Sequence, residues 1–420
     1  MSVRKLILTA LLMGLGSSYH VTLPARAETA RPAVSADFQK QFNAQMEAHL
    51  RQTLGRSPIN FSLEVKPKAA ACQGCSSYHL GLPSHLQRDT LFDVTLDHDG
   101  SAPVLKGRVY SLREKELLVK SVTAEMGQPK LVSIETFPFS NVGKDYAITR
   151  SQADLYVKPQ AVAGENLATQ ARLGTPVRLL QYSPDGKFAL ARIEDDGYIA
   201  WIQRKDLIEG EQTWYQDWLS KRQVLLMKSV NKPVALPVGT RLKLVHQSGA
   251  TVSAVLPDGK PVQLSKADVV INQPGKLPAA DVLLKTARYY LPKGPQGGGS
   301  YLWGGTYGTR LDCSGFVQTV YRLNGVYLPR DADQQKGFTQ RVADKLAQVA
   351  ELKAGDLVFF SGNGNYPTHV GMYIGNHQVI HSSPKGPYSG VKINTLVGGG
   401  DYDLYLQKIY FGGGRVTRSL

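Results

Sequence analysis

A run of short alternating segments between residues 151 and 209 constrains the fold most strongly. Apolar and polar residues alternate in ADLYVKP, LGTPVRLLQY, KFALARI and YIAWIQ, and Pro-Asp-Gly and Asp-Asp-Gly interrupt the run. Alternation with a period of two predicts half-buried strands, and these tripeptides favour tight turns. The pattern therefore predicts a small β-barrel. Residues 222–272 repeat it in a more divergent form.

The segments on either side of these barrels have a different character. Residues 31–148 contain FQKQFNAQMEAHLRQTL near their start, whose apolar residues recur every four positions, and continue with strand and helix patterns. We interpret them as a small α+β domain whose role the sequence does not disclose. A linker rich in Pro and Gly precedes a final domain at 279–412, and we expect the tail GGGRVTRSL to be loose.

The first residues form a separate signal. Arg4 and Lys5 precede an apolar run from Leu6 to Leu15, and Ala-Arg-Ala follows. This order of basic, apolar and small residues predicts a cleavable secretory signal over residues 1–27. The run is far shorter than the roughly 20 residues that span a bilayer. We therefore expect a secreted or periplasmic protein without a membrane span.

The formal net charge of +15 suits an anionic partner, although it could simply keep the protein in solution. Nucleic acid and the acidic polymers of a cell wall are both anionic. Export favours the wall, and no base-reading motif accompanies the lysines, so we expect no nucleic-acid binding. We further expect a monomer that requires no metal and no organic cofactor.

Three cysteines are present. Cys72 and Cys75 form a CxxC pair that could be a structural disulfide, a redox pair or half of a zinc site. No second CxxC follows, and His79 and His85 alone are a weak ligand set, so a disulfide is favoured over metal. The remaining thiol, Cys313, needs a different explanation.

The segment around Cys313 turns from a glycine-rich loop into a helix. In YLWGGTYGTRLDCSGFVQTVYRLNG the apolar residues after the cysteine have helical spacing, with Asp312 or Thr309 available as the cap. Cys313 then lies in the first turn, where free backbone N–H groups favour the thiolate. A lone cysteine is ordinarily a small buried hydrophobe. Its place at a polar helix start favours a nucleophile instead.

Two histidines lie in strand-like runs that a turn joins. THVGMYIG contains His369 and QVIHSSP contains His381, and both lie at equal distances from Gly375 in the turn. They should be neighbours across an antiparallel hairpin, unless the register slips by one residue. A thiol that attacks an amide needs an imidazole to take and return its proton. Our hypothesis makes His369 that base and acid, oriented by His381.

Six ordered motifs make the final domain recognisable. YLWGG, LDCSGFVQ, LPRDADQQ, LKAGDLVFF, THVGMYIG and VIHSS follow the order of the NlpC/P60 family of bacterial cell-wall peptidases. The strand, turn and Trp order of residues 151–209 resembles bacterial SH3-like domains. Together these features resemble the dipeptidyl-peptidase VI type of the family, which hydrolyses the γ-D-glutamyl to meso-diaminopimelate bond.

The resemblance implies an α+β chain in which a papain-like cysteine peptidase domain follows two SH3-like barrels and the N-terminal α+β domain. It implies a secreted endopeptidase that acts on peptidoglycan or muropeptides. Cys313, His369 and His381 match the catalytic Cys, His and third polar residue of the family. The residues that match groove positions are Tyr198, Tyr301, Trp303, Asp312, Ser314, Arg330 and Asp331.

Some of these matches carry a more specific role. Tyr301 could help to stabilise the oxyanion, and Asp312 or Asp331 could bind a peptide amine. Tyr198 resembles a tyrosine that closes the groove in relatives selective for a free N-terminal L-alanine. Those relatives carry an acidic residue where this chain has Thr175, so that selectivity is not implied here.

Two alternatives stay open. The chain could be a wall-binding protein whose peptidase domain is silent, although the intact Cys, His and His argue against it. It could also cut a different amide, as a muramoyl-L-alanine amidase does, or transfer an acyl group through the same thioester.

Overall fold

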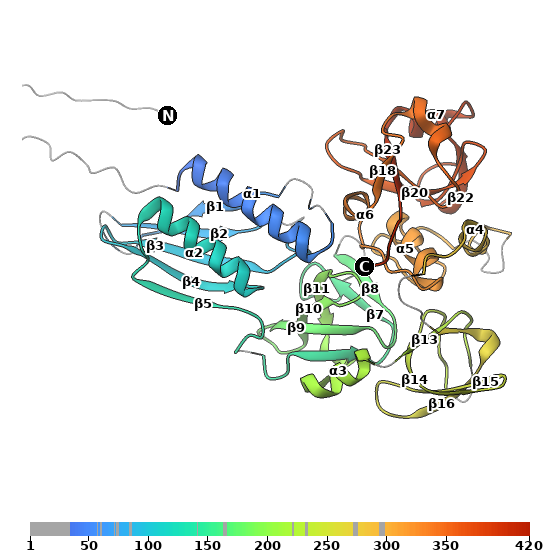
Figure 1. Cartoon of the computed structure of the whole chain (residues 1–420), viewed down its shortest axis with the longest axis horizontal. Helices are drawn as coiled ribbons and strands as arrows, with labels where there is room; N and C mark the ends of the chain where they lie inside the picture. Colours follow the sequence, from blue (N-terminus) through green and yellow to red (C-terminus); the bar gives the residue numbers. More distant parts are fainter. Residues whose placement is uncertain are drawn as a thin grey trace, which may run out of the picture.

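The structure is a computed structural model that describes residues 34–56, 58, 61–70, 72, 75–83, 86–140, 142–162, 166–220, 222–231, 234–271, 276–293 and 299–420. The predicted secretory signal and His85 lie outside these residues. Within the described part, four sheets follow one another along the chain (Figure 1). None of the helices in that part is long and apolar enough to cross a membrane.

The N-terminal unit is a sheet with the strand order β1-β2-β3-β4-β5, covered on one face by two helices (Figure 1). Its neighbours are antiparallel except β4 and β5, which are parallel and connected through α2. The four-residue period predicted for the first helix is confirmed, because Phe38, Phe42, Met46 and Leu50 are all buried. The elements are α1 (Ala36–Thr53), β1 (Glu64–Pro67), β2 (Ser76–Gly81), β3 (Phe92–His98), β4 (Pro103–Val109), α2 (Leu112–Met126) and β5 (Leu131–Glu135).

The predicted disulfide is confirmed. Cys72 and Cys75 are bonded, with their Cα atoms 5.3 Å apart, immediately before β2. Cys313 carries a free thiol.

The second sheet has the order β12-β6-β9-β10-β11-β7-β8 and encloses its own apolar core. The strand β6 straddles the predicted boundary between residues 148 and 151, and its pairing with β9 and β12 makes it part of this sheet. The elements are β6 (Tyr146–Thr149), β7 (Ala153–Tyr156), β8 (Leu167–Ala171), β9 (Pro176–Tyr182), β10 (Phe188–Ile193), β11 (Ile199–Gln203), η1 (Arg204–Asp206), β12 (Leu207–Gly210) and the following helix α3 (Gln212–Ser220).

The third sheet, in the order β16-β15-β14-β13-β17, also surrounds a separate core. The predicted hairpin at AVLPDGKPVQL corresponds to β15 and β16, which pair from Val255 and Pro261 outward. The elements are β13 (Gln223–Leu226), β14 (Arg241–Ser248), β15 (Thr251–Val255), β16 (Pro261–Ser265), η2 (Lys266–Asp268) and β17 (Val269–Ile271).

The C-terminal unit is built on the sheet β18-β23-β19-β20-β21-β22. Residues that alternate along β19, β20 and β21 form two cores, one shared with α4 and α5 and one shared with α7. The elements are α4 (Ala280–Arg288), α5 (Cys313–Leu323), α6 (Ala332–Phe338), β18 (Gln340–Val342), η3 (Leu346–Glu351), β19 (Leu357–Phe360), β20 (His369–Gly375), β21 (Gln378–Ser383), β22 (Gly390–Thr395), α7 (Asp401–Lys408) and β23 (Tyr410–Arg415).

The tail after residue 412 is not loose, contrary to our expectation. Its first residues continue β23, and Leu420 donates its backbone N–H to the carbonyl of Tyr327 at 3.0 Å. Arg418 donates to the carbonyl of Gly55 in the N-terminal unit and lies over the Phe338 ring. The tail therefore helps to hold the first and last units together.

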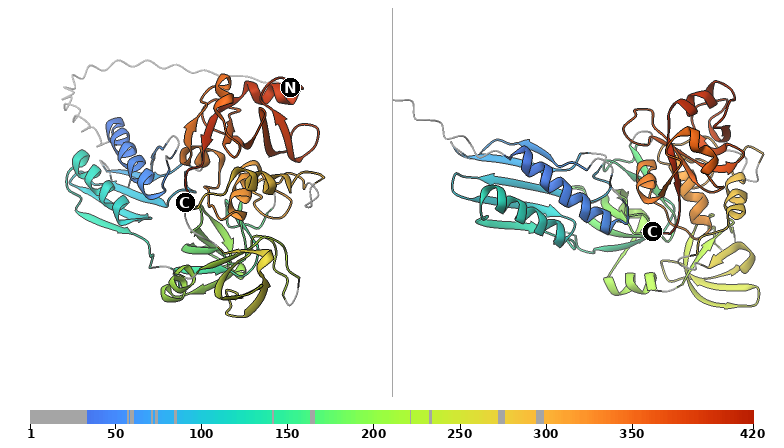
Figure 2. Two further views of the ribbon diagram at one scale, coloured as in Figure 1. Left: turned by 45° about the vertical axis from the view of Figure 1, so that its right-hand side comes forward. Right: turned by 45° about the horizontal axis from the view of Figure 1, so that its top comes forward.

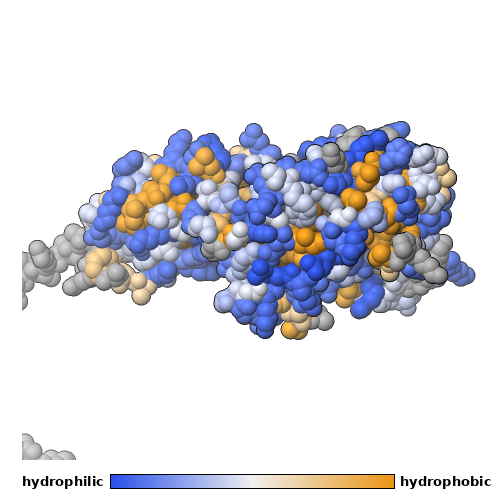
Figure 3. Space-filling model, turned by 90° about the horizontal axis from the view of Figure 1, so that it is seen from below, coloured by the Kyte–Doolittle hydropathy of each residue, from blue (hydrophilic) through white to orange (hydrophobic). Residues whose placement is uncertain are grey.

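Buried polar contacts join the central units to the C-terminal one, and Figure 2 shows the second and third sheets lying against it. Asp195 of the second sheet pairs with Arg241 of the third sheet and, at 2.6 Å, with Arg322 of α5. Arg172 is buried and donates to the carbonyl of Thr306. On the face shown in Figure 3, hydrophilic residues predominate and hydrophobic residues form separate patches.

Candidate active site

The start of α5 presents Cys313 as the first residue of the helix. Asp312 is the N-cap, and its Oδ1 accepts the backbone N–H of Gly315 at 2.6 Å. Its Oδ2 accepts the N–H of Gly304 at 2.9 Å, which ties the preceding loop to the helix. Of the two predicted caps, Asp312 is the one used. The prediction that Cys313 lies in the first turn is confirmed.

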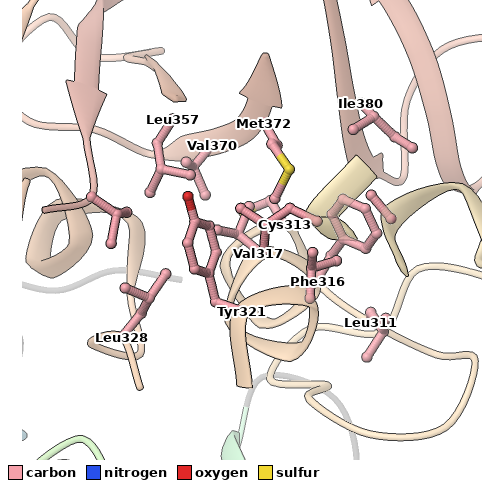
Figure 4. Close-up of a cluster of buried hydrophobic side chains, with 14 of the residues drawn as sticks. Leu311, Cys313, Phe316, Val317, Tyr321, Leu328, Leu357, Val370, Met372 and Ile380 are labelled. Atoms are coloured by element: carbon pink, nitrogen blue, oxygen red, sulfur yellow. The ribbon is translucent and has the colours of Figure 1, made fainter. Parts of the chain in front are cut away.

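The environment of the Cys313 thiol is largely apolar. Figure 4 shows it between Val370 and Met372 of β20 and Val317 of α5, as part of the core cluster of this unit. Burial raises the pKa of Cys313 to about 12, and the negative charge of Asp312 adds to this, although the N–H of Val370 acts in the opposite direction. The backbone N–H of Ser314 at the helix start also lowers this pKa, as we expected, but burial outweighs it and favours the neutral thiol.

His369 and His381 lie in contact. His369 Nε2 is 2.6 Å from His381 Nδ1, so the prediction that the two imidazoles are neighbours is confirmed. Burial lowers the pKa of His369 well below its usual value, and the pKa of His381 falls to about 4 mainly for the same reason. Both rings are thus neutral near pH 7.

The register of the hairpin differs from the one we predicted. The turn residues are Asn376 and His377, with φ of 51° and 57°, and a bulge lies between Tyr373 and Gly375. Two successive residues with positive φ form a type I′ turn, whose twist matches that of the strands. Extending the observed pairing places Gly371, rather than His369, opposite His381. The two histidines are therefore diagonal neighbours on one face.

Two residues that sequence reasoning missed continue the chain of hydrogen bonds. Asn394 Nδ2 donates to Asp403 Oδ1 at 2.7 Å, and Asn394 Oδ1 lies 2.9 Å from His381 Nε2. Because a carboxylate only accepts, this orientation of the amide is required. His381 Nε2 then carries the proton and its Nδ1 accepts from His369 Nε2. The network leaves Nδ1 of His369 as the unprotonated nitrogen.

A groove of about 370 Å³ opens beside Cys313. Thr368, the residue before His369, lies on its wall, whereas His369 and His381 are not among the residues that line it. The predicted site residues that line it with Cys313 are Tyr198, Tyr301, Trp303, Asp312, Ser314 and Asp331. Trp303 is 60% exposed at the rim, whereas Tyr198 is buried in the wall.

Arg330 and Thr175 do not line the groove among the described residues. Arg330 is buried behind it, where it pairs with Asp312 at 2.5 Å and donates to Ser314 Oγ at 2.9 Å. Its Nε also donates to Thr169 of β8, which links the groove wall to the second sheet. Thr175 is buried and donates its backbone N–H to Thr149.

Arg88 of the N-terminal unit is a further groove residue that the sequence did not indicate. Its guanidinium pairs with Asp331 at 2.5 Å and with Asp333. The two partners lie 243 and 245 residues further along the chain. No local pattern connects positions so far apart, so only the fold reveals the contact.

Known protein families match two parts of this chain. The NlpC/P60 family matches residues 298–408, and the bacterial dipeptidyl-peptidase SH3 domain matches residues 155–207. The gamma-D-glutamyl-L-lysine dipeptidyl-peptidase of Bacillus subtilis is 31% identical over 252 residues, which are 58% of this chain and 77% of that protein. The chain belongs to the NlpC/P60 family.

Two further comparisons each cover between one half and two thirds of the chain. The gamma-D-glutamyl-L-lysine dipeptidyl-peptidase of Bacillus cereus is 31% identical over 237 residues, 51% of this chain and 67% of that protein. A crystal structure of an NlpC/P60 family protein from Bacillus cereus superposes with a TM-score of 0.53 at 27% identity, and it covers 64% of this chain and 99% of that one. The chain is thus a member of a family of peptidoglycan-hydrolysing peptidases.

Proposed function

We propose that this protein hydrolyses peptidoglycan stem peptides with Cys313 as nucleophile and His369 as base and acid. The observation that carries the proposal is the hydrogen-bond chain from Asp403 through Asn394 and His381. It fixes one tautomer of His369 and leaves Nδ1 free for the proton of the thiol. The Val370 N–H, next to His369 in the chain, contacts the Cys313 sulfur and supports this pairing.

The reaction follows from these positions. Cys313 Sγ attacks the carbonyl carbon of the scissile amide while its proton passes to His369 Nδ1. The backbone N–H groups at the start of α5 and the hydroxyl of Tyr301 are the donors for the oxygen that becomes negative. The imidazolium then protonates the departing amine and leaves a thioester. Water, deprotonated by the same imidazole, cleaves the thioester and restores the thiol.

The names of the relatives support the choice of bond. Two of them are named gamma-D-glutamyl-L-lysine dipeptidyl-peptidases, and the motifs of this chain resemble enzymes that cut γ-D-glutamyl to meso-diaminopimelate. Both bonds join the γ-carbonyl of D-Glu to a diamino acid. We propose the meso-diaminopimelate bond as the target, with the L-lysine bond as the closest competitor. The predicted signal at residues 1–27 supports action in the bacterial cell envelope.

The test uses purified muropeptides with either diamino acid and mass spectrometry of the products. We expect the wild-type protein to cut after D-Glu and to free a peptide that begins with the diamino acid, faster when that residue is meso-diaminopimelate. A muropeptide linked to glycan keeps its L-Ala-D-Glu end, whereas a stem peptide with a free amino end yields the L-Ala-D-Glu dipeptide. Cys313→Ala should release none and still bind the peptides. An exposed substitution far from the groove, Asp344→Ala, is the matched control and should cleave like the wild type.

Other products would identify the alternatives. Release of the intact stem peptide from muramic acid would indicate an amidase. Unchanged muropeptides would indicate a silent wall-binding protein. Cleavage by Cys313→Ala at the wild-type rate would end the proposed mechanism.

A further inference from the structure

The loop between β21 and β22, residues 384–389, is held largely by one side chain. All six residues are exposed. Outside helices and strands, the described residues show no hydrogen bond between two backbone groups that involves this loop. Lys392 of β22 restrains it instead, because its Nζ donates to the carbonyls of Ser383, Lys385 and Tyr388. A short turn at the start of the loop and the Tyr388 hydroxyl near its end add local contacts.

The Lys392 ammonium suits this position. Lys392 is 2% exposed, and the three carbonyls match the three N–H donors of an ammonium group. The ring centroids of Tyr388 and Tyr402 lie 4.9 Å and 6.0 Å from its Nζ. Burial lowers the pKa of Lys392 to about 8, so the ammonium form predominates at pH 7, and even the neutral amine retains two N–H donors. Lys392 is therefore a buried cation that organises the backbone around it.

The end of this loop contacts the segment that carries Tyr301. Ser389, the last residue of the loop, accepts the backbone N–H of Tyr301 on its Oγ at 3.0 Å. Gly390 follows at the start of β22, where an added Cβ would lie 2.0 Å from the carbonyl oxygen of Gly299. The two segments are thus too close for a side chain between them. The backbone of Tyr301 is held by the end of the loop that Lys392 organises.

The position of Tyr301 matters because its side chain lines the groove beside Cys313. Burial raises the pKa of Tyr301, and the charge that Cys313 carries as a thiolate acts in the same direction. The hydroxyl therefore stays protonated and can donate to the oxygen that becomes negative during attack. Such a donor is effective only within hydrogen-bond distance of that oxygen, so a shift of the Tyr301 backbone would weaken it.

We propose that Lys392 is a positioning residue: its ammonium fixes the loop 384–389, and the loop places Tyr301 beside Cys313. Lys392 does not line the groove among the described residues, so it acts through Tyr301 rather than on the substrate. The inference rests on the proposed function, because it concerns the contribution of Tyr301 to that reaction. Loss of Lys392 should lower kcat and leave KM nearly unchanged.

The test is a double-mutant cycle of Lys392→Met and Tyr301→Phe, with one purified muropeptide at pH 7. Tyr301→Phe removes the hydroxyl donor, so kcat should fall about 100-fold or more. Lys392→Met should lower kcat about tenfold or more, because the donor is then misplaced. Since both act through one hydroxyl, the double variant should be no slower than Tyr301→Phe. Losses that multiply in the double variant, or a wild-type kcat in either single variant, overturn the inference.

Lys385→Met is the matched control. Lys385 and Lys392 both lower the pKa of His369, after burial and His381. The Lys385 side chain lies over the Tyr405 ring, and only its backbone carbonyl accepts from Lys392. Lys385→Met thus removes a nearby cation without removing the restraint on the loop, and its kcat should stay within about twofold of the wild type. An equal loss in both lysine variants would assign the effect to charge near His369 and overturn the inference.

Ser389→Ala tests the same path without a buried substitution. Ser389 is exposed, so the variant should fold like the wild type, with an unchanged midpoint of urea unfolding. It removes the Oγ that accepts the Tyr301 N–H, so kcat should fall about threefold or more. This variant decides the question even if Lys392→Met does not fold. A wild-type kcat in Ser389→Ala would show that the loop does not position Tyr301.

Hydrogen exchange separates this inference from the proposed function, because it requires no turnover. Lys392→Met should speed amide exchange in peptides that cover 384–389 and in those that cover 299–303, whereas Lys385→Met should not. Faster exchange confined to 384–389 would overturn the inference. Faster exchange in both segments, with no hydrolysis by the wild type, would reject the proposed function and keep the role of Lys392 in holding Tyr301. Wild-type hydrolysis with unchanged exchange would do the reverse.

Discussion

Cys313 and His369 are both uncharged in the resting protein, because burial opposes the charged form of each. Burial therefore disfavours a thiolate–imidazolium pair before substrate binds. In the proposed mechanism the proton moves when the sulfur attacks, and the fixed tautomer of His369 leaves its Nδ1 unprotonated for that transfer. Residue types and spacing predicted that Cys313 begins a helix and that the two imidazoles are neighbours. They could not predict protonation states, which depend on the surrounding packing.

The first prediction concerns pH. Because the pKa of His369 lies well below 6.5, its neutral form persists into mild acid, and activity is lost only as falling pH protonates it. The thiol needs no prior ionisation, so kcat/KM should be flat from pH 6.5 to roughly 8.5. Initial rates across this range, in buffers of constant ionic strength, provide the measurement. A steep rise in kcat/KM between about pH 8 and 9 would contradict the prediction, since it would report an independently titrating thiol.

At the scale of elements, the hairpin shows what the sequence could and could not predict. Two strand-like runs and a short turn were enough to bring His369 and His381 together on one face. The register could not be predicted from the sequence. The turn at Asn376 and His377, together with the bulge between Tyr373 and Gly375, shifts the pairing by two residues. The helix start at Cys313 was predictable, because capping is a local property of the chain.

Gly371 provides the prediction at this scale. A Cβ there would lie 2.5 Å from Val379 Cγ2 and 3.0 Å from the Cβ of His381. Gly371→Ala must therefore push β20 away from β21 and separate the histidines. We expect a fall in kcat of about tenfold or more and a loss of stability of about 1–3 kcal/mol. Steady-state kinetics and urea unfolding measure the two effects.

Gly143→Ala is the control for that substitution. Nothing lies within 4 Å of the added Cβ there, so stability should change by less than about 0.5 kcal/mol and activity should not change. Wild-type kinetics in Gly371→Ala would show that the contact of the two imidazoles is dispensable.

For the whole molecule, the order of units followed from the sequence, but their mutual contacts did not. Alternating strands, amphipathic helices and turn tripeptides are local signals, and each unit carries enough of them to be recognised. Arg88 and Asp331 carry no such signal, nor does the docking of Arg418 on Gly55. These contacts depend on how completed units pack, which the residues around each position do not encode.

Substitution of Asp195 measures how much its ion pairs with the third sheet and with α5 contribute to stability. Its carboxylate is 4% exposed and compensates the guanidiniums of Arg241 and Arg322. Asp195→Ala removes the carboxylate that these two buried guanidiniums share, so we expect a loss of about 3–5 kcal/mol. Urea unfolding followed by tryptophan fluorescence measures it. Asp344→Ala, which breaks an exposed pair with Arg341, should cost less than about 1 kcal/mol. Equal losses in both variants would mean that the buried network contributes no more than a surface pair.

The ion pairs of Arg88 with Asp331 and Asp333 also limit which units of this chain can be exchanged for those of another protein. Chains of this kind look modular, since each sheet has its own core and could be exchanged for another. The groove is not modular, because one wall belongs to the N-terminal unit and the nucleophile to the C-terminal one. A chimera that takes only the C-terminal unit contains Cys313 but lacks Arg88. Asp331 and Asp333 then lose this ion-pair partner. An exchange that preserves these ion pairs has to transfer residues 86–89 and 331–333 as one set.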